Sequence, residues 1–406
     1  MMNTIVQKFG GTSLLTETQR AAVVERILRT RTDGFAPVVV VSALGRLGDP
    51  YATDSLLRLA VDVSEAPRAR SVDLLLSCGE IIAAVVLAET LHRFGCDAVA
   101  LSGAQCGIIT DKAHGRARVL SVKGERLQEA LQAGHVPVVA GFQGITDDGD
   151  VTTLGRGGSD TTAVVLGSFL HAECVEIYTD VDGVKTADPK LFPRASTIEA
   201  LTYREIMEMA HLGTRVLHPR AVEIAAEQGL VIKVLSASGG KQTIIGPGSV
   251  NGTGAEIHDR VVTGIAHMSG RAQVQVTGTV DFNRSKQTLR VFDAMSHNGI
   301  SVDLIYVSPD RIAFIIDEPL ASQAQEALVG LELESTVQTG FAKVSVVGAG
   351  MHGVPGVMLR VVRALDAAGV DIFQTTDSHA NISCLIREEK LAQAVEALHT
   401  EFQLGL

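Results

Sequence analysis

The sequence predicts an α/β protein with a mostly parallel sheet sandwiched by helices, followed by two small α+β modules of the ferredoxin-like type. Two observations lead to this prediction. Over roughly the first 245 residues, apolar runs alternate with longer amphipathic segments, which is the rhythm of βα units in a parallel sheet. Beyond a Gly-, Pro- and Ser-rich stretch at Gly246–Ala255, the chain repeats itself with an offset of 70 residues.

The elements expected in the first region follow from this alternation. The expected strands are Thr4–Phe9, Pro37–Ala43, Ala98–Leu101, Val136–Phe142, Glu176–Thr179 and Val231–Leu235. The expected helices are Gln19–Arg31, Ser71–Phe94, Glu125–Ala133, Ser159–Leu170, Tyr203–His211 and Pro219–Gln228. Because parallel sheets of this kind bind ligands at the carboxyl ends of their strands, we expect the chemistry in the loops that follow the strands.

The repeat defines the second region. Ala272, Val274, Val276 and Gly278 recur as Ala342, Val344, Val346 and Gly348, and the register holds through strand, helix, strand and helix without a gap. Each copy reads βαββαβ or close to it. We therefore expect a first domain at 1–245, a linker at 246–260, one module at 261–335 and a second at 336–406.

The second copy contains a dinucleotide fingerprint out of context. Val344–Gly353 (VSVVGAGMHG) is a strand followed by G-x-G-x-x-G, but only 53 residues follow Gly353. A complete dinucleotide-binding fold needs more chain than this. We favour a turn and helix start that binds a small effector or packs against a partner module.

Composition restricts the function classes. The net charge of -11 and the lack of a long basic cluster argue against a nucleic-acid partner. No apolar run reaches the expected length for spanning a bilayer, and a strand-like run beginning at Ile5 leaves no room for a signal peptide. The five cysteines are scattered without a CxxC pair, so we expect reduced thiols, no metal site and a cytoplasmic location.

The most informative stretch is Leu154–Ala163 (LGRGGSDTTA), which lies between an apolar run and a helical segment. Gly157 and Gly158 remove Cβ atoms where a ligand must approach the backbone. Ser159 and Asp160 occupy helix-cap positions, where N–H groups point at bound anions, and Arg156 suits a carboxylate. The alternative is a capped turn with an incidental arginine.

Three motifs in the first half carry a similar ambiguity. Lys8–Ser13 (KFGGTS) follows a strand and suits a phosphate cradle, or it is a surface lysine before a tight turn. Ser42 and Thr53 are candidates for binding a substrate amine or carboxylate, or they are turn-forming hydroxyls. Glu80 in Ser77–Glu80 (SCGE) lies in an apolar stretch, so it either pairs structurally or receives a cationic ligand.

Acids and lysines gather after a later strand. Thr179–Lys190 (TDVDGVKTADPK) suits a nucleotide site with lysines on phosphates, or it is a solvated Asp/Gly loop. Arg215 in Thr214–Arg220 (TRVLHPR) adds a positive charge at a helix-to-turn junction.

Together these motifs resemble a known family. KFGGTS, SCGE, FQG with TTLGRGGSDTTA, TDVDGV with TADP, and VLHPRA occur in the order found in the aspartate kinases of the amino acid kinase family. The tail, VGAGMHGVPGV with DSH, is similar to the end of the paired ACT regulatory modules of that family. The resemblance covers essentially the whole chain, and the pairing of KFGGTS with GRGGSDTTA is highly specific.

The resemblance implies a MgATP-dependent phosphoryl transfer to the β-carboxylate of L-aspartate, giving 4-phospho-L-aspartate for lysine, threonine, methionine and diaminopimelate synthesis. It implies that Lys8 stabilises the transferred phosphoryl group and that Asp160 orients Lys8. The implied substrate residues are Ser42, Thr53, Glu80, Arg156, Gly157, Gly158 and Ser159. The implied nucleotide residues are Lys8, Phe9, Gly10, Gly11, Thr179, Asp180, Lys185, Lys190, Arg215 and Val216.

The chain departs from the family pattern at two of these positions. Lys185 stands where the family usually has tyrosine, and Arg215 stands where it usually has lysine. Both keep or add positive charge, which preserves catalysis while changing the expected base stacking and phosphate grip.

The resemblance also bears on regulation and assembly. Gln374–His379 (QTTDSH) stands in place of the QxSTSE-like stretch of lysine- and threonine-inhibited relatives. We therefore expect diaminopimelate, then lysine, as the effector. ACT modules usually pair across subunits, so a homodimer is expected. Two other interpretations stay open: a related kinase with another acceptor, and a sensor with an inactive kinase domain.

Overall fold

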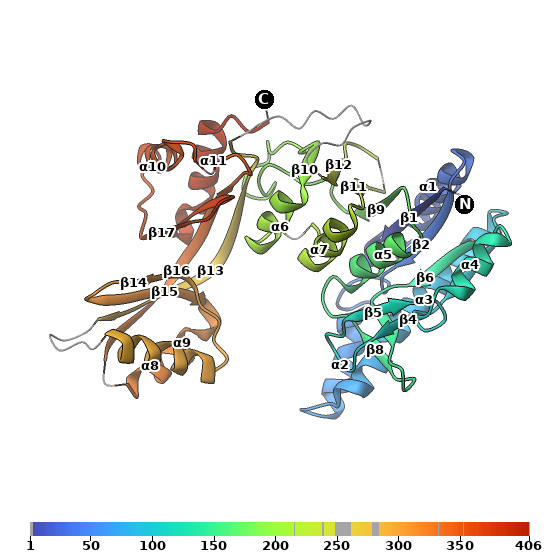
Figure 1. Cartoon of the computed structure of the whole chain (residues 1–406), viewed down its shortest axis with the longest axis horizontal. Helices are drawn as coiled ribbons and strands as arrows, with labels where there is room; N and C mark the ends of the chain where they lie inside the picture. The colour runs from blue at the N-terminus through green and yellow to red at the C-terminus, as the bar shows by residue number, and fades with distance from the viewer. Residues whose placement is uncertain are drawn as a thin grey trace. The chain divides into compact units, whose positions relative to one another are not determined.

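The computed structural model of the chain describes residues 3–214, 216–237, 239–247, 261–277, 284–331, 333–351 and 353–405 (Figure 1). It divides into two compact units that are interleaved along the chain. The first comprises Met1–Val184, Thr197–Ala210 and Arg215–His258, and the second comprises Lys185–Ser196, His211–Thr214 and Asp259–Leu406. Most of the expected linker at 246–260 lies outside the described residues, and the linear domain boundaries stay predictions.

The first unit is built on an eight-stranded sheet in the order β10-β12-β11-β9-β1-β2-β6-β3. Its strands are β1 (Thr4–Phe9), β2 (Ala36–Val41), β3 (Ala98–Leu101), β6 (Val136–Ala140), β9 (Cys174–Thr179), β10 (Ala200–Thr202), β11 (Ile232–Ser236) and β12 (Thr243–Gly246). All neighbours pair in parallel except β11 and β12. The expectation of a mostly parallel sheet is confirmed.

The helices of this unit are α1 (Glu17–Thr32), α2 (Thr53–Val63), α3 (Ala69–Arg93), α4 (Glu125–Gln132), α5 (Gly158–Phe169), α6 (Tyr203–His211) and α7 (Pro219–Gln228). Local sequence explains several ends. Thr16 and Gln19 form a reciprocal capping box at the start of α1. Pro219 opens α7 and Gly229, at φ +65°, closes it.

A second, four-stranded sheet in this unit has the order β5-β4-β7-β8. Its strands are β4 (Ile108–Thr110), β5 (Val119–Val122), β7 (Gln143–Ile145) and β8 (Val151–Thr153). Sequence analysis did not predict this sheet, because strands of three or four residues are too short to show a period of two. Helix α2 was not predicted either.

Helix α3 corrects one expectation. It has 25 residues and a mean hydropathy of 2.0 in its most apolar window, so by length and composition it is able to cross a membrane. Half of that window is buried, and Ala83, Leu87 and Leu91 are almost fully enclosed in the core beside β2 and β6. The helix is therefore a core element of this unit, although an apolar segment of spanning length was not expected from the sequence.

The second unit contains a six-stranded antiparallel sheet in the order β14-β15-β13-β16-β18-β17. Its strands are β13 (Gly264–Thr277), β14 (Asp303–Val307), β15 (Arg311–Asp317), β16 (Glu334–Val347), β17 (Gln374–Asp377) and β18 (Asn381–Arg387). Its helices are α8 (Arg284–His297), α9 (Ala321–Val329), α10 (Val357–Ala367) and α11 (Leu391–Glu401). The succession of strand, helix, two strands and helix occurs twice, as the internal repeat predicts.

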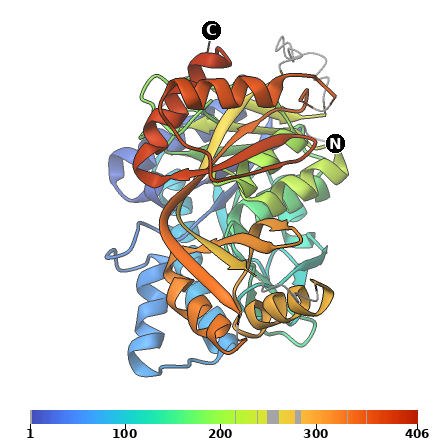
Figure 2. The same cartoon turned by 90° about the vertical axis from the view of Figure 1, so that its left-hand side faces the viewer.

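Two long strands belong to both halves of this sheet. Gly264–Met268 of β13 pairs with the end of β16, whereas Arg271–Thr277 pairs with both β15 and the start of β16. Figure 2 shows these strands running through the sheet, from the half that carries α8 and α9 to the half that carries α10 and α11. Each ferredoxin-like half therefore borrows a strand segment from the other's long strand.

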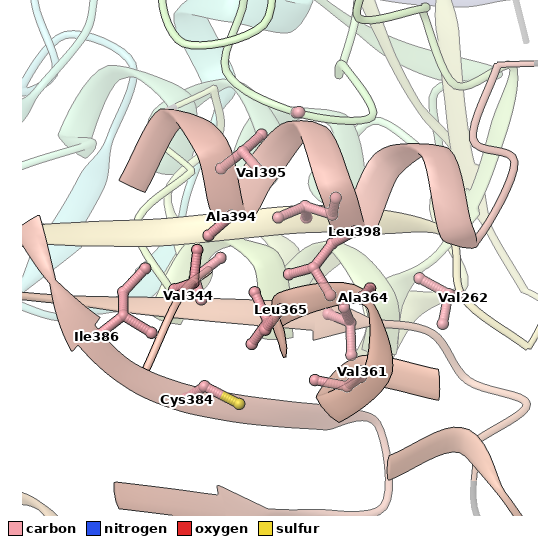
Figure 3. Packing of buried hydrophobic residues seen from close by; sticks show 14 of the residues in the cluster. Val262, Val344, Val361, Ala364, Leu365, Cys384, Ile386, Ala394, Val395 and Leu398 are labelled. Carbon is pink, nitrogen blue, oxygen red and sulfur yellow. The ribbon is translucent and has the colours of Figure 1, made fainter. Parts of the chain in front are cut away.

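The half of the six-stranded sheet that carries α10 and α11 has its own apolar core. Val344, Val361, Leu365, Ile386 and Leu398 point toward one another from β16, β18, α10 and α11 (Figure 3). Ala187 and Phe192, from the segment Lys185–Ser196, join the same core. Gly348 begins the fingerprint-like stretch. Its backbone packs tightly against a neighbouring segment, because an added Cβ would lie 2.3 Å from the Val261 carbonyl oxygen. The matching turn of the first copy, Gly278–Asn283, lies outside the described residues.

Candidate active site

Four neighbouring strands of the first unit end together. Phe9 at the end of β1 stands opposite Tyr178 of β9 and Val41 of β2, and Val41 stands opposite Ala140 of β6. Several of the sequence-predicted site residues, among them Lys8, Gly10, Gly11, Ser42 and Thr179, lie at the ends of these strands or in the loops that follow them. The fold thus gathers segments that are distant in sequence at one edge of the parallel sheet.

An ion pair lies at this edge. Lys8 Nζ, near the end of β1, is 2.8 Å from Asp160 Oδ1, in the first turn of α5. The two side chains are only 14% and 12% exposed. The amino end of a helix favours negative charge, so Asp160 is well placed to hold the lysine ammonium. The two residues predicted to be catalytic are therefore in direct contact.

The glycine loop after β1 fits closely against the loop after β2. A Cβ at Gly11 would lie 1.8 Å from the Ala43 carbonyl oxygen, while the Gly45 N–H donates to the Gly11 carbonyl oxygen (3.3 Å). Gly10 is different, because the nearest atom to its hypothetical Cβ is 4.0 Å away. Gly11 is required for the packing of the loop, whereas Gly10 leaves backbone open to a ligand.

The amino end of α5 is equally tight. Gly157 has φ +67°, and a Cβ there would lie 2.2 Å from Cβ of His218. A Cβ at Gly158 would meet the Phe142 ring at 2.7 Å. Ser159 is buried against Gly141, at the end of β6, whereas Arg156 is exposed. The predicted substrate loop is thus a helix amino terminus with an arginine at its solvent side.

Sequence analysis missed His218. It caps α7 by accepting a hydrogen bond from the Arg220 N–H (3.3 Å) at Nδ1, and it packs on Gly157. Burial lowers the pKa of its imidazole, against the opposing effect of Asp160. The signal was present in the HPR triplet, in which a capping residue precedes a proline at the first helical position.

Glu80 lies on the inner side of α3 and is 2% exposed. The Ala43 N–H donates to its Oε1 at 3.3 Å, while Oε2 has no hydrogen-bond partner among the described residues. Burial raises the pKa of the carboxyl group to about 8. Gly79 allows α3 to pack closely against the segment that contains Tyr51, because a Cβ at Gly79 would lie 2.8 Å from the Tyr51 carbonyl oxygen.

The two predicted hydroxyl residues differ in placement. Ser42 is half-buried, and its N–H donates to the Phe9 carbonyl oxygen (3.2 Å), which ties the loop after β2 to β1. Thr53 is the first residue of α2, which packs against α3. No hydrogen bond joins Thr53 to Ser42 or Glu80 in the part of the chain that the structure describes.

The loop after β9 carries the first predicted nucleotide residues. Thr179 Oγ1 donates to Asp180 Oδ1 (3.1 Å), and Arg46, from the loop after β2, pairs with Asp180 Oδ2 (3.2 Å). The Arg46 and Asp180 side chains are 71% and 65% exposed. Arg46 is a second residue that sequence analysis missed, since nothing in the sequence marks its approach to β9.

The other predicted nucleotide residues are distributed differently. Lys185 and Lys190 belong to the second unit, with the chain crossing between units after Val184. Val216 is half-buried in the first unit. Arg215 lies outside the described residues.

The side chains that commonly bind metals are those of His, Cys, Asp and Glu. No group of three or more His, Cys, Asp or Glu residues is arranged to hold a metal ion within the described ranges.

Comparisons with known proteins agree with this geometry. The amino acid kinase family matches residues 3–236, and an ACT domain matches residues 336–400. Aspartokinase 1 of Bacillus subtilis is 43% identical over 405 residues, covering 100% of both chains. The aspartokinase of Geobacillus stearothermophilus is 40% identical, covering 100% of this chain and 98% of the relative.

Solved structures give the same result. Aspartate kinase from Synechocystis is 36% identical and covers 99% of this chain and 70% of its own, with a TM-score of 0.54. E. coli aspartokinase III, solved with aspartate and ADP, shares the fold with a TM-score of 0.75, at 23% identity and with 98% of this chain and 99% of its own covered. The chain therefore belongs to the amino acid kinase family and, within it, to the aspartokinases.

Proposed function

We propose that this protein is an aspartate kinase that transfers the γ-phosphoryl group of ATP to the β-carboxylate of L-aspartate, giving 4-phospho-L-aspartate. This is the first step toward lysine, threonine, methionine and diaminopimelate, and we place it in the cytoplasm. The observation that carries the proposal is the Lys8–Asp160 pair, 2.8 Å apart at the amino end of α5 and beside a glycine loop.

The chemistry needs little beyond positioned charge. Phosphoryl transfer proceeds through a transition state whose charge is spread over phosphoryl oxygens, and fixed cations and helix amino ends stabilise it. The acceptor carboxylate is already ionised near neutral pH, so no strong general base is required. In this proposal Lys8 binds the transferred group, and Asp160 fixes the direction of the Lys8 ammonium.

Glu80 is the proposed partner of the aspartate amine. Its Oε2 is buried without a partner in the described chain, and its raised pKa shows that an isolated carboxylate is unfavourable there. An incoming ammonium would supply the missing charge. Arg156 is the proposed partner of a substrate carboxylate, with Ser42, Thr53, Gly157, Gly158 and Ser159 lining the pocket.

ATP would be held by its phosphates at Gly10 and Gly11 and by Phe9, Thr179, Asp180, Lys185, Lys190, Arg215 and Val216. Magnesium commonly takes one or two protein carboxylates and completes its shell with phosphates and water. We propose that such an ion uses Asp180, an exposed carboxylate in the loop after β9, as its protein ligand. When bound, the ion would neutralise phosphate charge, and Lys8 would act on the transferred group.

Regulation is proposed through the ACT modules. The E. coli enzyme has also been solved with lysine and aspartate in a T-state. We propose diaminopimelate, then lysine, as the effector of this chain, on the basis of Gln374–His379. Pairing of ACT modules would give a homodimer.

A hydroxamate assay tests the activity. The purified protein is incubated with MgATP and hydroxylamine, together with aspartate, glutamate, acetylglutamate or bicarbonate in turn. Formation of aspartyl hydroxamate, in preference to the other products, is the expected result. ATP binding without any acyl phosphate would favour a sensor, and preference for another acceptor would favour a related kinase.

A further inference from the structure

A second buried carboxylate, Asp73, lies near the start of α3 and is fully enclosed. It accepts hydrogen bonds from His114 Nδ1 (2.9 Å), from the Gly115 N–H (3.0 Å to each carboxylate oxygen) and from Thr153 Oγ1 (2.6 Å). Because a carboxylate only accepts, the ring proton of His114 lies on Nδ1. The protein itself therefore satisfies Asp73, whereas Oε2 of Glu80 has no partner in the described chain.

Asp73 and Glu80 lie on the same face of α3. They are seven residues apart, which is about two helical turns, or about 10 Å along the helix axis. Both are buried, at 0% and 2% exposure. One face of α3 thus carries a carboxylate that is open to a ligand and another that is tied to neighbouring loops.

The donors to Asp73 belong to segments that border the predicted substrate loop. Thr153 is the last residue of β8, and the loop that carries Arg156 follows it directly. Gly115 packs on that loop, because a Cβ at Gly155 would lie 3.1 Å from the Gly115 carbonyl oxygen. Asp73 therefore fixes both the start of the substrate loop and the segment on which the loop rests.

The rest of this region has anchors of its own. Arg220 Nη1 donates to the Leu154 carbonyl oxygen (3.3 Å) from the start of α7. The first turn of α5 is held separately, since the Phe142 N–H donates to Thr162 Oγ1 (3.1 Å). A change at Asp73 should consequently displace the substrate loop while leaving the start of α5 in place.

Stability alone does not account for a charge at this position. Replacing a buried, paired charge by well-packed apolar side chains is often neutral or stabilising, whereas a satisfied network of hydrogen bonds specifies one geometry. We infer that Asp73 is a positioning residue for substrate binding, which holds the loop that carries Arg156 in a fixed place relative to Glu80. The inference rests on the proposed function, in which Glu80 and Arg156 bind aspartate.

Steady-state kinetics of Thr153→Val tests the inference, because this change removes one donor to Asp73 at nearly constant volume. The KM for aspartate should rise about tenfold, since a misplacement of about 1 Å costs up to about 10²-fold, and the KM for ATP should stay unchanged. Thr153→Ser keeps the hydroxyl group and should restore the wild-type KM.

The matched control is Thr110→Val, which removes a buried hydrogen bond to Thr152 Oγ1 (2.6 Å) within the same four-stranded sheet. It should lose stability like Thr153→Val but keep the wild-type KM for aspartate. An unchanged KM in Thr153→Val, or an equal rise in Thr110→Val, would overturn the inference.

Asp73→Asn adds a larger perturbation. The amide nitrogen cannot accept a hydrogen bond, so one donor among His114, Gly115 and Thr153 loses its acceptor. The KM for aspartate should rise further than in Thr153→Val, and a wild-type KM in folded Asp73→Asn would contradict the inference. If Asp73→Asn is recovered unfolded, the comparison of Thr153→Val with Thr110→Val still decides.

Limited proteolysis provides a measurement that does not depend on activity. Arg156 is exposed, and trypsin cleavage after it gives a fragment that mass spectrometry identifies. This cleavage should be several times faster in Thr153→Val than in the wild type or Thr110→Val, because the loop is released. Equal cleavage rates would overturn the inference. Absence of aspartyl hydroxamate from the wild type would instead refute the proposed function, and the cleavage rates would still decide whether Asp73 holds the loop.

Discussion

Buried polar side chains at the edge of the eight-stranded sheet and inside the six-stranded sheet differ in whether they have hydrogen-bond partners. At the first, Glu80 is 2% exposed and its Oε2 has no partner among the described residues. At the second, Ser345 and Ser383 bond to each other at 2.7 Å, and Lys343, 4% exposed, pairs with Asp303. A buried carboxylate oxygen that stays unsatisfied is costly, so we propose that a ligand completes the structure beside Glu80.

The largest expected effect follows from removing the central cation. Lys8→Met should lower kcat by about 10²–10³-fold, because one preorganised charge on the transferred group is lost. The control is Lys112→Met, which removes a lysine paired with Asp148 at the surface of the same unit. Both variants should keep the wild-type melting temperature within a few degrees, and near-wild-type turnover in Lys8→Met would end the site assignment.

Glu80 should control aspartate binding rather than turnover. Glu80→Gln should raise the KM for aspartate by about 30-fold, the equivalent of about 2 kcal/mol for losing one partner of a buried charged pair. In the wild type, burial raises the pKa of Glu80 to about 8, so binding of the substrate ammonium below that pH must release a proton. The KM should therefore fall as pH rises toward 8, and Glu80→Gln should lose this dependence.

The same carboxyl group makes a prediction for the unliganded protein. Its folded pKa lies above the ordinary value of 4.5, so the folded state holds a proton that the unfolded chain releases between pH 4.5 and about 8. The free energy of unfolding should therefore fall across this window. Glu80→Gln should be more stable than the wild type at pH 8 in denaturant titrations, and equal stability at pH 4 and pH 8 in the wild type would contradict the account.

The glycine loop offers a comparison within one motif. Gly11→Ala should destabilise the protein by about 1–3 kcal/mol, because its Cβ would overlap the Ala43 carbonyl group. Gly10→Ala has no atom closer than 4.0 Å to the new Cβ and should keep the wild-type stability. Chemical denaturation of the two variants measures the difference in their free energies of unfolding. Equal losses of stability would contradict the claim that close packing requires glycine at position 11.

The smallest effect is expected in the second unit, at a pair of buried polar side chains that satisfy each other. Thr186 Oγ1 and His399 Nε2 are 2.9 Å apart in a buried pair, and burial lowers the pKa of the imidazole below its ordinary value of 6.5. The unfolded chain therefore binds a proton that the folded chain resists, and stability should fall as pH drops below about 6.5. Thr186→Val should cost about 1 kcal/mol in denaturant titrations, and His399→Gln should flatten the acid side of the stability profile.

The sequence was sufficient for elements with a strong period or a strong end signal. β1 and α7 begin and end where they were predicted, because an apolar run and a proline-to-glycine helix leave few alternatives. The contact of Lys8 with Asp160 agrees with the family resemblance, which implied that Asp160 orients Lys8. The motifs lie close together in space because the strand order places β9, β1, β2 and β6 side by side.

Other features depended on three-dimensional packing. His218 meets Gly157, and Arg46 meets Asp180, across 61 and 134 residues of sequence respectively. No local pattern encodes such pairs. The exchange of strand segments between β13 and β16 was missed for a similar reason, because a linear repeat gives no indication that each half completes the other's sheet.

A crystal structure of the full chain with ADP and L-aspartate tests the central claim most directly. The account predicts the amine of aspartate within hydrogen-bond distance of Glu80 Oε2, its side-chain carboxylate facing Lys8, and the ADP phosphates over Gly10. Aspartate bound with its amine away from Glu80, or the nucleotide bound away from the loop after β1, would contradict it.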